Sequence, residues 1–368
     1  MIRTAARQFW YLCALGVWGL WGFAVFNGMF DRLNTAMATR TMPDGRQLRD
    51  VYSGNAFLDE RLTLLSAFYE VLTNNLSSGP RLLFFDINAV VACTNLWVLI
   101  ESRRMGVRNV FLKYPIWAMI LWNANGAAIM QPPFFYALCK SKARLRNAMI
   151  PTNEARALFV TTFAILLCPL LIFAPAWMGS TTWDHHGYIA YFHYSPIVVF
   201  GFFIGASLLL PSTPSAGRAA AATKESKKWI VLALMLAGTT AAVVHLYTVI
   251  GALVTNDPDI SLARLFVPAR GMTDPIHSLP SASMGLVPEY AALLENFHLF
   301  SQYDWIVVTL SCVLFAHLLL SRRDGEDKPS LLTTREETRE LAYLSAATLI
   351  LGPGAVGSFA LALREGRV

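Results

Sequence analysis

Long apolar runs separated by short polar connections dominate this chain. Runs of about 20 mostly apolar residues are long enough to cross a bilayer as α-helices. The pattern predicts eight such helices, at 8–28, 82–101, 111–139, 153–177, 191–211, 228–254, 303–321 and 339–363. A further segment, 62–75, is too short to cross unaided, and it predicts a tilted short span, a re-entrant helix or an interfacial helix. The expected fold class is therefore all-α: a polytopic transmembrane helical bundle of eight helices with a possible ninth.

The connections between the apolar runs are too short to form a separate soluble domain, so we expect a single integral-membrane domain over residues 1–368. Two connections, 29–61 and 255–300, are long and rich in turn residues. Within the second, 288–299 has the pattern of an amphipathic helix that lies on the membrane surface. We expect the chain to enter the bilayer directly after it, at Asp304.

Composition supports a membrane protein and excludes several other classes. Hydrophobic residues make up 55% of the chain and charged residues 15%, whereas soluble domains usually carry about 25% charged residues. The net charge of +6 arises from Lys and Arg in short loops such as 140–146, 218–228 and 321–328. This placement follows the positive-inside rule and is not a nucleic-acid-binding pattern. The five cysteines have no paired spacing, so neither a disulfide framework nor a zinc site is expected.

No cofactor or metal is predicted. The sequence has no nucleotide-binding loop, dinucleotide fingerprint or zinc-protease motif in a plausible setting. The run Asp184, His185, His186 offers metal-binding side chains. Three consecutive helical residues point in different directions, which is poor geometry for one metal ion.

Ionisable residues at membrane depth are candidates for function, because a charge is costly in hydrocarbon. They are Glu70, Asp86, Glu101, His245, Asp304 and His317. Asp304 lies between Tyr303 and Trp305, and no Lys or Arg occurs within ten positions on either side. Burial without a cation favours the neutral carboxylic acid, which can donate a proton to a substrate. A carboxylate that caps a helix N-terminus is the structural alternative.

The other acids have structural alternatives close by. Arg104 lies three residues after Glu101 and can pair with it on a helix. Asp86 lies near the start of its predicted helix, where the macrodipole favours a carboxylate. Asp86 and Glu101 are about 22 Å apart along that helix, so they cannot form one catalytic pair. Glu70 has no Lys or Arg within one helical turn, so a structural and a functional role both stay open for it.

Buried amides and prolines predict a cavity. The segment 121–138 carries Asn123, Asn125 and Gln131 and then Pro132–Pro133, which we expect to kink the helix. Phe134, Phe135 and Tyr136 follow and could form walls. Ordinary polar contacts between membrane helices are the alternative. His245, near the centre of its span, could bind a substrate group or be a hydrogen-bonded structural histidine.

Two functional classes fit these features. One is a cofactor-free enzyme that acts on a lipophilic substrate. The other is a proton-coupled transporter of a lipophilic small molecule, in which Asp304 and Glu101 would relay protons. Transporters often contain repeated halves, and the sequence has no internal repeat.

Several segments resemble a known enzyme family. YEVLTNNLSSGP, IESRRMGVRN, WNANGAAIMQPPFFYAL, VHLYTV and FSQYDW occur in this order. Over residues 60–320 the chain resembles the fungal integral-membrane terpene cyclases of meroterpenoid biosynthesis, of the ascofuranone/ascochlorin cyclase type. The resemblance implies a multi-pass enzyme of secondary metabolism in the endoplasmic reticulum membrane. It also implies cofactor-independent, isomerase-type cyclisation of an epoxyfarnesyl chain on an aromatic core.

The resemblance also suggests roles for individual residues. IESRRMG and FSQYDW place the catalytic acids at Glu101 and Asp304, with Asp304 as the first choice. One of these acids protonates the epoxide, and aromatic faces stabilise the resulting carbocation. The residues expected to bind substrate are Glu70, Trp97, Asn123, Gln131, Phe134, Phe135, Tyr136, His245, Tyr303 and Trp305. The expected partners are this prenylated substrate and membrane lipids.

Overall fold

The computed structural model describes residues 6–104, 109–140, 149–211, 219–257, 259–268, 285–320 and 334–367. In these ranges the regular secondary structure is helical, apart from one isolated antiparallel bridge between Thr41 and Gln47. The all-α prediction is therefore confirmed. Of the basic loops, residues 141–146, 218 and 321–328 lie outside the described residues.

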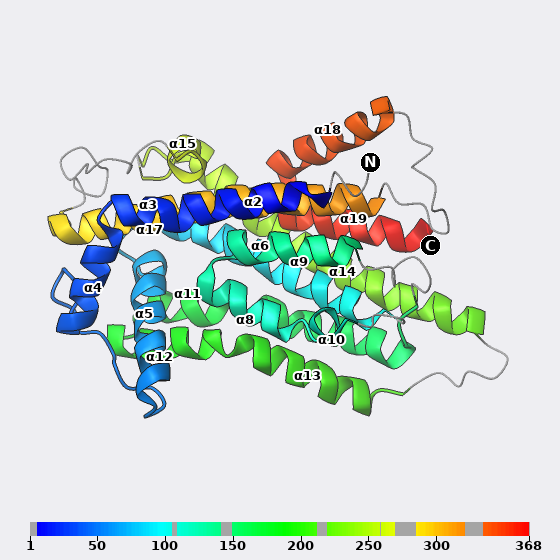
Figure 1. Cartoon of the computed structure of the whole chain (residues 1–368), viewed down its shortest axis with the longest axis horizontal. Helices are drawn as coiled ribbons and strands as arrows, with labels where there is room; N and C mark the ends of the chain where they lie inside the picture. The colour runs from blue at the N-terminus through cyan, green and yellow to red at the C-terminus, as the bar shows by residue number, and fades with distance from the viewer. Residues whose placement is uncertain are drawn as a thin grey trace.

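Among the described residues, five segments are long and apolar enough to cross a membrane. They are Gln8–Phe26, α6 (Ser78–Arg103), Thr152–Trp177, Ala222–Val254 within α14 (Ala219–Val254), and α17 (Pro288–Leu320). The first comprises α2 (Gln8–Val17), the π-helical turn η1 (Trp18–Gly22) and α3 (Phe23–Phe26); the third comprises α10 (Thr152–Leu167) and α11 (Leu170–Trp177). A sixth would be α12 (Thr182–His193) with α13 (Ser195–Leu209), which meet at a bend of 49°. The long helices run side by side along the longest axis (Figure 1).

The prediction of eight helices is wrong, because several of the predicted spans are broken, two of them at a glycine. Residues 111–139 form α7 (Val110–Lys113), α8 (Ile116–Asn125) and α9 (Ala127–Lys140), and α8 and α9 part at Gly126, where φ is +93°. Residues 339–363 form α18 (Thr334–Leu351) and α19 (Pro353–Arg367), which part at Gly352, where φ is +83°. A positive φ is accessible to glycine and interrupts a helix without lowering hydropathy.

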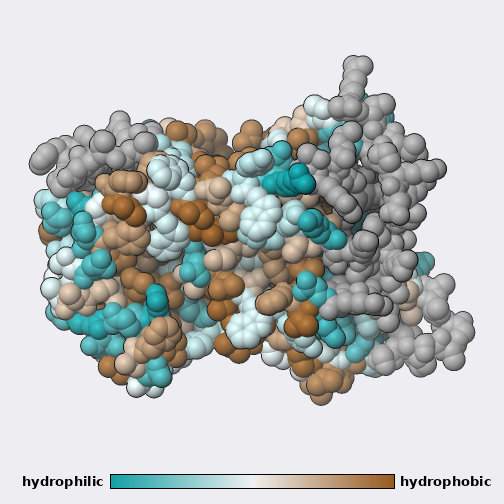
Figure 2. Space-filling model, in the orientation of Figure 1, coloured by the Kyte–Doolittle hydropathy of each residue, from teal (hydrophilic) through white to brown (hydrophobic). Residues whose placement is uncertain are grey.

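The short segment at 62–75 belongs to α5 (Ala56–Thr73). The Asn55 side chain caps its first turn by accepting a hydrogen bond from the amide of Leu58 (3.1 Å). Together with α4 (Met29–Thr39), α5 lies crosswise to the long helices at one end of the molecule (Figure 1). We call α4 and α5 the cap layer. On the face in Figure 2, hydrophilic residues gather toward this end, and hydrophobic residues cover much of the middle.

Residues 288–299 are not a separate surface helix. They form the first turns of the continuous helix α17, and Tyr290, Leu294 and Phe297 are fully buried there. Asp304 therefore lies near the middle of α17 and does not cap its N-terminus. The helix is apolar on most sides because α2, α6, α9 and α19 pack around it. A short helix, α15 (Leu262–Phe266), covers part of the α6–α17 contact.

Candidate active site

A cavity of about 180 Å³ lies between the cap layer and the long helices. Its wall comes from η1, α4, α5, α6, α8 and α17 and from the α8–α9 break at Gly126. A β-carbon at Gly126 would stand 2.5 Å from a methyl group of Leu20 and 3.9 Å from Oδ1 of Asp304. The break therefore needs glycine both for its positive φ and for this close approach.

Asp304 is the only acidic residue that lines the cavity in the described part of the chain. Its side chain is 8% exposed. The oxygen Oδ1 accepts a hydrogen bond from the backbone N–H of Ala128 (2.7 Å), in the first turn of α9. Neither an ion pair to Asp304 nor a hydrogen bond to its Oδ2 occurs among the described residues. This geometry leaves one carboxyl oxygen for a substrate, while the amide at the α9 N-terminus stabilises negative charge on the other.

Aromatic side chains make up much of the remaining wall. The Phe68 ring lies 4.5 Å from that of Phe297 and 5.0 Å from that of Phe300, measured between centroids. The aromatic residues that line the cavity are Trp21, Phe30, Phe68, Tyr69, Phe84, Trp122 and Phe300. Aromatic faces attract a cation without reacting with it, so this wall suits a reaction that develops positive charge.

Polar contacts to the cavity are few. The backbone oxygen of Asn123 accepts a hydrogen bond from the hydroxyl group of Tyr69 (3.2 Å), and the Asn123 amide side chain lines the cavity. Burial raises the pKa of the Tyr69 hydroxyl, so this group stays a donor at neutral pH. The amides of Asn34, Asn88 and Asn125 also border the cavity.

Of the residues that the sequence predicted to be catalytic or substrate-binding, Asp304 and Asn123 line this cavity. Glu101 does not. It is 1% exposed at the far end of α6, where its Oε1 accepts hydrogen bonds from Arg104 (3.0 Å) and Arg364 (2.5 Å). Glu365 accepts from the same two guanidinium groups, at 2.5 and 2.7 Å. The pairing with Arg104 matches the structural alternative, and Arg364 and Glu365 extend it into a buried cluster of four charges.

Glu70 lies one residue from Tyr69 but outside the cavity wall. It is 1% exposed and accepts hydrogen bonds from Arg46 and from the Asn74 amide (3.2 Å). Burial raises the pKa of the Glu70 carboxyl group, and the positive charge of Arg46 opposes that rise. The cation is 24 residues away in sequence, which is why no local pattern indicated it.

His245 and Trp305 meet at Asp86. The Oδ2 of Asp86 lies 2.9 Å from Nδ1 of His245, and it accepts a hydrogen bond from Nε1 of Trp305 at 2.9 Å. The His245 and Trp305 rings stack with a centroid distance of 6.4 Å. Neither of these rings lines the cavity, so the trio joins α6, α14 and α17 beside it.

The other predicted substrate-binding residues pack between helices outside the cavity wall. Gln131 donates a hydrogen bond to Thr94 (2.8 Å), and Trp97 donates one to Ser358 (2.9 Å). Ring contacts account for the rest: Phe134 with Trp122, Phe135 with Phe315, Tyr136 with Trp10, and Tyr303 with Phe23.

Sequence reasoning missed most of the aromatic wall. Trp21 lies in the predicted span 8–28 and Phe30 in the connection 29–61, neither of which indicated a site. Phe68 lies in the short segment 62–75, for which the sequence left three topologies open. Their convergence depends on α4 and α5 folding across the end of the bundle. The local signal was the density of aromatic residues in "FYEVL" and "LWGFAVF". This density does not indicate that the two segments meet in the fold.

Comparisons with known proteins place the chain among enzymes. The model of the CtvD domain family matches residues 6–368. The chain is 58% identical to "Terpene cyclase DEP1" of Fusarium langsethiae and 58% identical to "Terpene cyclase DEP1" of Alternaria brassicicola, in both cases over 100% of each chain. It is 25% identical to "Terpene cyclase alnG" of Emericella nidulans, over 96% of this chain and 92% of that protein. No solved structure matches.

Proposed function

The chain belongs to the CtvD domain family, and from this premise we propose that it is a membrane-bound terpene cyclase that closes rings on a prenylated substrate in the cavity beside Asp304. The names of the relatives at 58% identity support an enzyme of cyclisation. The single observation that supports the assignment of the site is Asp304, a buried acid with no cationic partner among the described residues, in an aromatic cavity.

The proposed substrate is an epoxyfarnesyl chain on an aromatic head group. In the first step the proton on Oδ2 of Asp304 moves to the epoxide oxygen, and the adjacent carbon–oxygen bond breaks to give a hydroxyl group and a tertiary cation. The Asp304 carboxylate that remains is stabilised by the N–H of Ala128. Neighbouring alkenes attack the cation in turn, and loss of a proton ends the sequence, so the product is an isomer of the substrate.

The walls suit this chemistry. The rings of Phe68, Trp122 and Phe300 face the space in which the cations form. A lipophilic chain displaces water from an apolar cavity, and this protects each cation from early capture. The apolar helices agree with a membrane location, and as part of the proposal we place the enzyme in the endoplasmic reticulum membrane.

The test is a conversion assay in microsomes from a yeast host that expresses the chain. An epoxyfarnesyl aromatic compound is expected to give a cyclised product of unchanged mass, and dissipating the proton gradient is expected to have no effect. The variant Asp304→Asn should form no product. The matched control Glu289→Gln removes an exposed acid from the same helix, where it pairs with Arg32, and should retain activity. Product from Asp304→Asn at the control's level would refute the assignment.

A further inference from the structure

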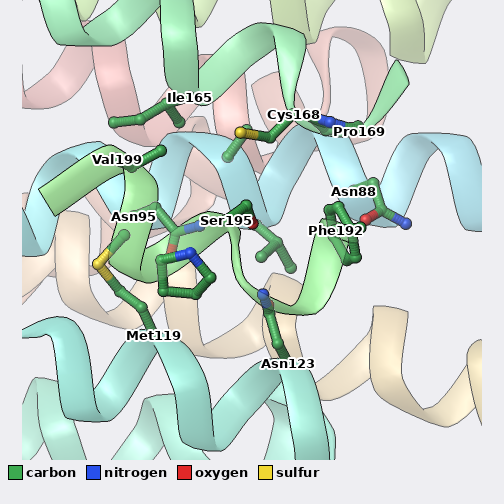
Figure 3. Close-up of a pocket in the computed structure, with 13 residues that line it drawn as sticks. Asn88, Asn95, Met119, Asn123, Ile165, Cys168, Pro169, Phe192, Ser195 and Val199 are labelled. Atoms are coloured by element: carbon green, nitrogen blue, oxygen red, sulfur yellow. The ribbon is translucent and has the colours of Figure 1, made fainter. Parts of the chain in front are cut away.

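A second, much smaller chamber adjoins the cavity. It has a volume of about 20 Å³. It shares Asn88, Val91 and Asn123 with the wall of the large cavity. The rest of its wall comes from α6, α8, the α10–α11 turn and the α12–α13 bend. Figure 3 shows Asn95, Asn123 and Ser195 around one space, with Asn88 beside Phe192.

Amide groups with unused hydrogen-bonding capacity border this chamber. Asn95 accepts a hydrogen bond from Nε1 of Trp122 (2.9 Å) through Oδ1, and Asn88 donates one to the backbone oxygen of Phe84 (2.8 Å) through Nδ2. The other halves of these two amides, and the whole side-chain amide of Asn123, have no hydrogen-bond partner in the described residues. An amide that has left water without gaining a hydrogen-bond partner is unfavourable.

These features match the requirements of an ordered internal water molecule. Such a site needs about 10–15 Å³ of accessible space and two to four polar partners. The chamber supplies about 20 Å³ and the free amide groups of Asn88, Asn95 and Asn123. We propose that the chamber holds a water molecule, and that this water accepts the proton that the last carbocation of the cyclisation loses.

The proposal rests on the proposed function and completes its proton balance. A C–H bond next to the final cation breaks, its electron pair forms the new alkene, and the proton forms a third O–H bond on the water. The water then passes this proton to the carboxylate of Asp304, which the first step left ionised. The enzyme returns to its initial state and no co-reactant is consumed.

The position of the chamber explains why water does not capture an early cation. Seven aromatic residues line the large cavity, whereas the small chamber has one, Phe192, and shares Asn88 and Asn123 with the large cavity. Hydrogen bonds to these amides hold the water in the small chamber, where it adjoins the large cavity. Only a cation that forms next to this chamber can lose its proton to the water, so the chamber determines which alkene isomer is made.

The test fills the chamber. Ala92, on α6, lines the small chamber but not the large cavity, and Ala92→Val places two additional methyl groups there. The control Ala89→Val adds the same groups on α6 at a buried position that borders neither space. We expect the rate at which Ala92→Val forms the wild-type isomer to fall by at least about 100-fold, and other alkene isomers to form in its place. The control should give the wild-type product. An unchanged product in Ala92→Val would overturn the proposal.

Two further readouts keep the result decisive. A high-resolution experimental structure should show density for one water within hydrogen-bond distance of Asn95 and Asn123, and an empty chamber would overturn the proposal whether or not the variants fold. A wild-type product with the mass of substrate plus water would show that the water is a nucleophile, which also contradicts the proposal. If the wild-type protein forms no ring, the proposed function fails, and the density still decides whether water occupies the chamber.

Discussion

Replacing Glu101 by Gln should lower stability and leave the chemical step intact. Glu101 and Asp304 are both buried acids, but their surroundings differ. Glu101 accepts hydrogen bonds from Arg104 and Arg364, whereas Asp304 accepts one from the backbone of Ala128. The side chain that replaces Glu101 keeps its size and loses its negative charge. Two guanidinium groups would then share the single carboxylate of Glu365.

The size of the effect follows from the burial of this cluster. The exposed fractions of the side chains are 1% for Glu101, 3% for Arg104 and 9% for Arg364. Removing one partner of such a buried pair costs about 3–5 kcal/mol, because the remaining charge is left without compensation. Since Glu365 still contacts both arginines, we expect a loss near the lower end of that range in the free energy of unfolding.

The assay measures stability and turnover separately. Thermal unfolding of the purified protein in detergent should show a clear loss for Glu101→Gln, while its single-turnover rate per folded molecule should stay close to that of wild type. Asp304→Asn should lose turnover and keep the stability of wild type. Its stability is kept because the amide oxygen still accepts the hydrogen bond from Ala128. A stable Glu101→Gln protein with no turnover would refute this reasoning and return Glu101 to a catalytic role.

Three further substitutions test the cavity and the cap layer. Gly126→Ala places a β-carbon 2.5 Å from Leu20 at a φ of +93°. We therefore expect the free energy of unfolding to fall by about 1–3 kcal/mol, measured by thermal unfolding, and little product to form. Stability and product formation equal to wild type would contradict the need for glycine at this position. Phe68→Leu keeps an apolar wall but removes a ring face, and single-turnover rates should fall about 2- to 30-fold; an unchanged rate would exclude Phe68 as a cation-stabilising group. Asp59 is partly desolvated, which opposes ionisation, but hydrogen bonds from Ser53 and from the backbone of 52–54 lower the pKa of its carboxyl group. The contribution of Asp59 to stability should therefore be complete above pH 3.8, the ordinary pKa of the group, and disappear as the pH falls through the lowered pKa. Over that lower pH range, proteolysis of the 40–55 connection should increase in wild type but not in Asp59→Asn. The same dependence of proteolysis on pH in both proteins would contradict this.

The sequence predicted the helical membrane class because hydropathy and length report it directly. It missed the breaks at Gly126 and Gly352, where a left-handed backbone conformation interrupts an apolar run. It also placed Asp304 at the start of a span, although residues 288–299 continue the same helix. Their polar side chains suggested a surface, but most of them are buried against neighbouring helices, and hydropathy does not report such contacts.

The candidate site was predictable only in part. The isolation of Asp304 from Lys and Arg is a local property, so it was visible in the sequence. The pairing of Glu101 with Arg104 was visible as a three-residue spacing, whereas Arg364 and Glu365 join from the other end of the chain. Phe68 and Trp21 reach the cavity through the packing of distant segments. Such convergence is a property of the tertiary fold and leaves no periodic signal.

The most direct test of the central claim is the single-turnover rate of ring formation in Asp304→Asn, with enzyme in excess over a prebound epoxide. A positioned general acid contributes about 10²–10⁴-fold, so the account predicts a rate lower by at least about 100-fold, with substrate affinity and thermal stability close to wild type. A rate within a few-fold of wild type, in a protein shown to be folded, would contradict the claim that the Asp304 carboxyl group starts the cyclisation.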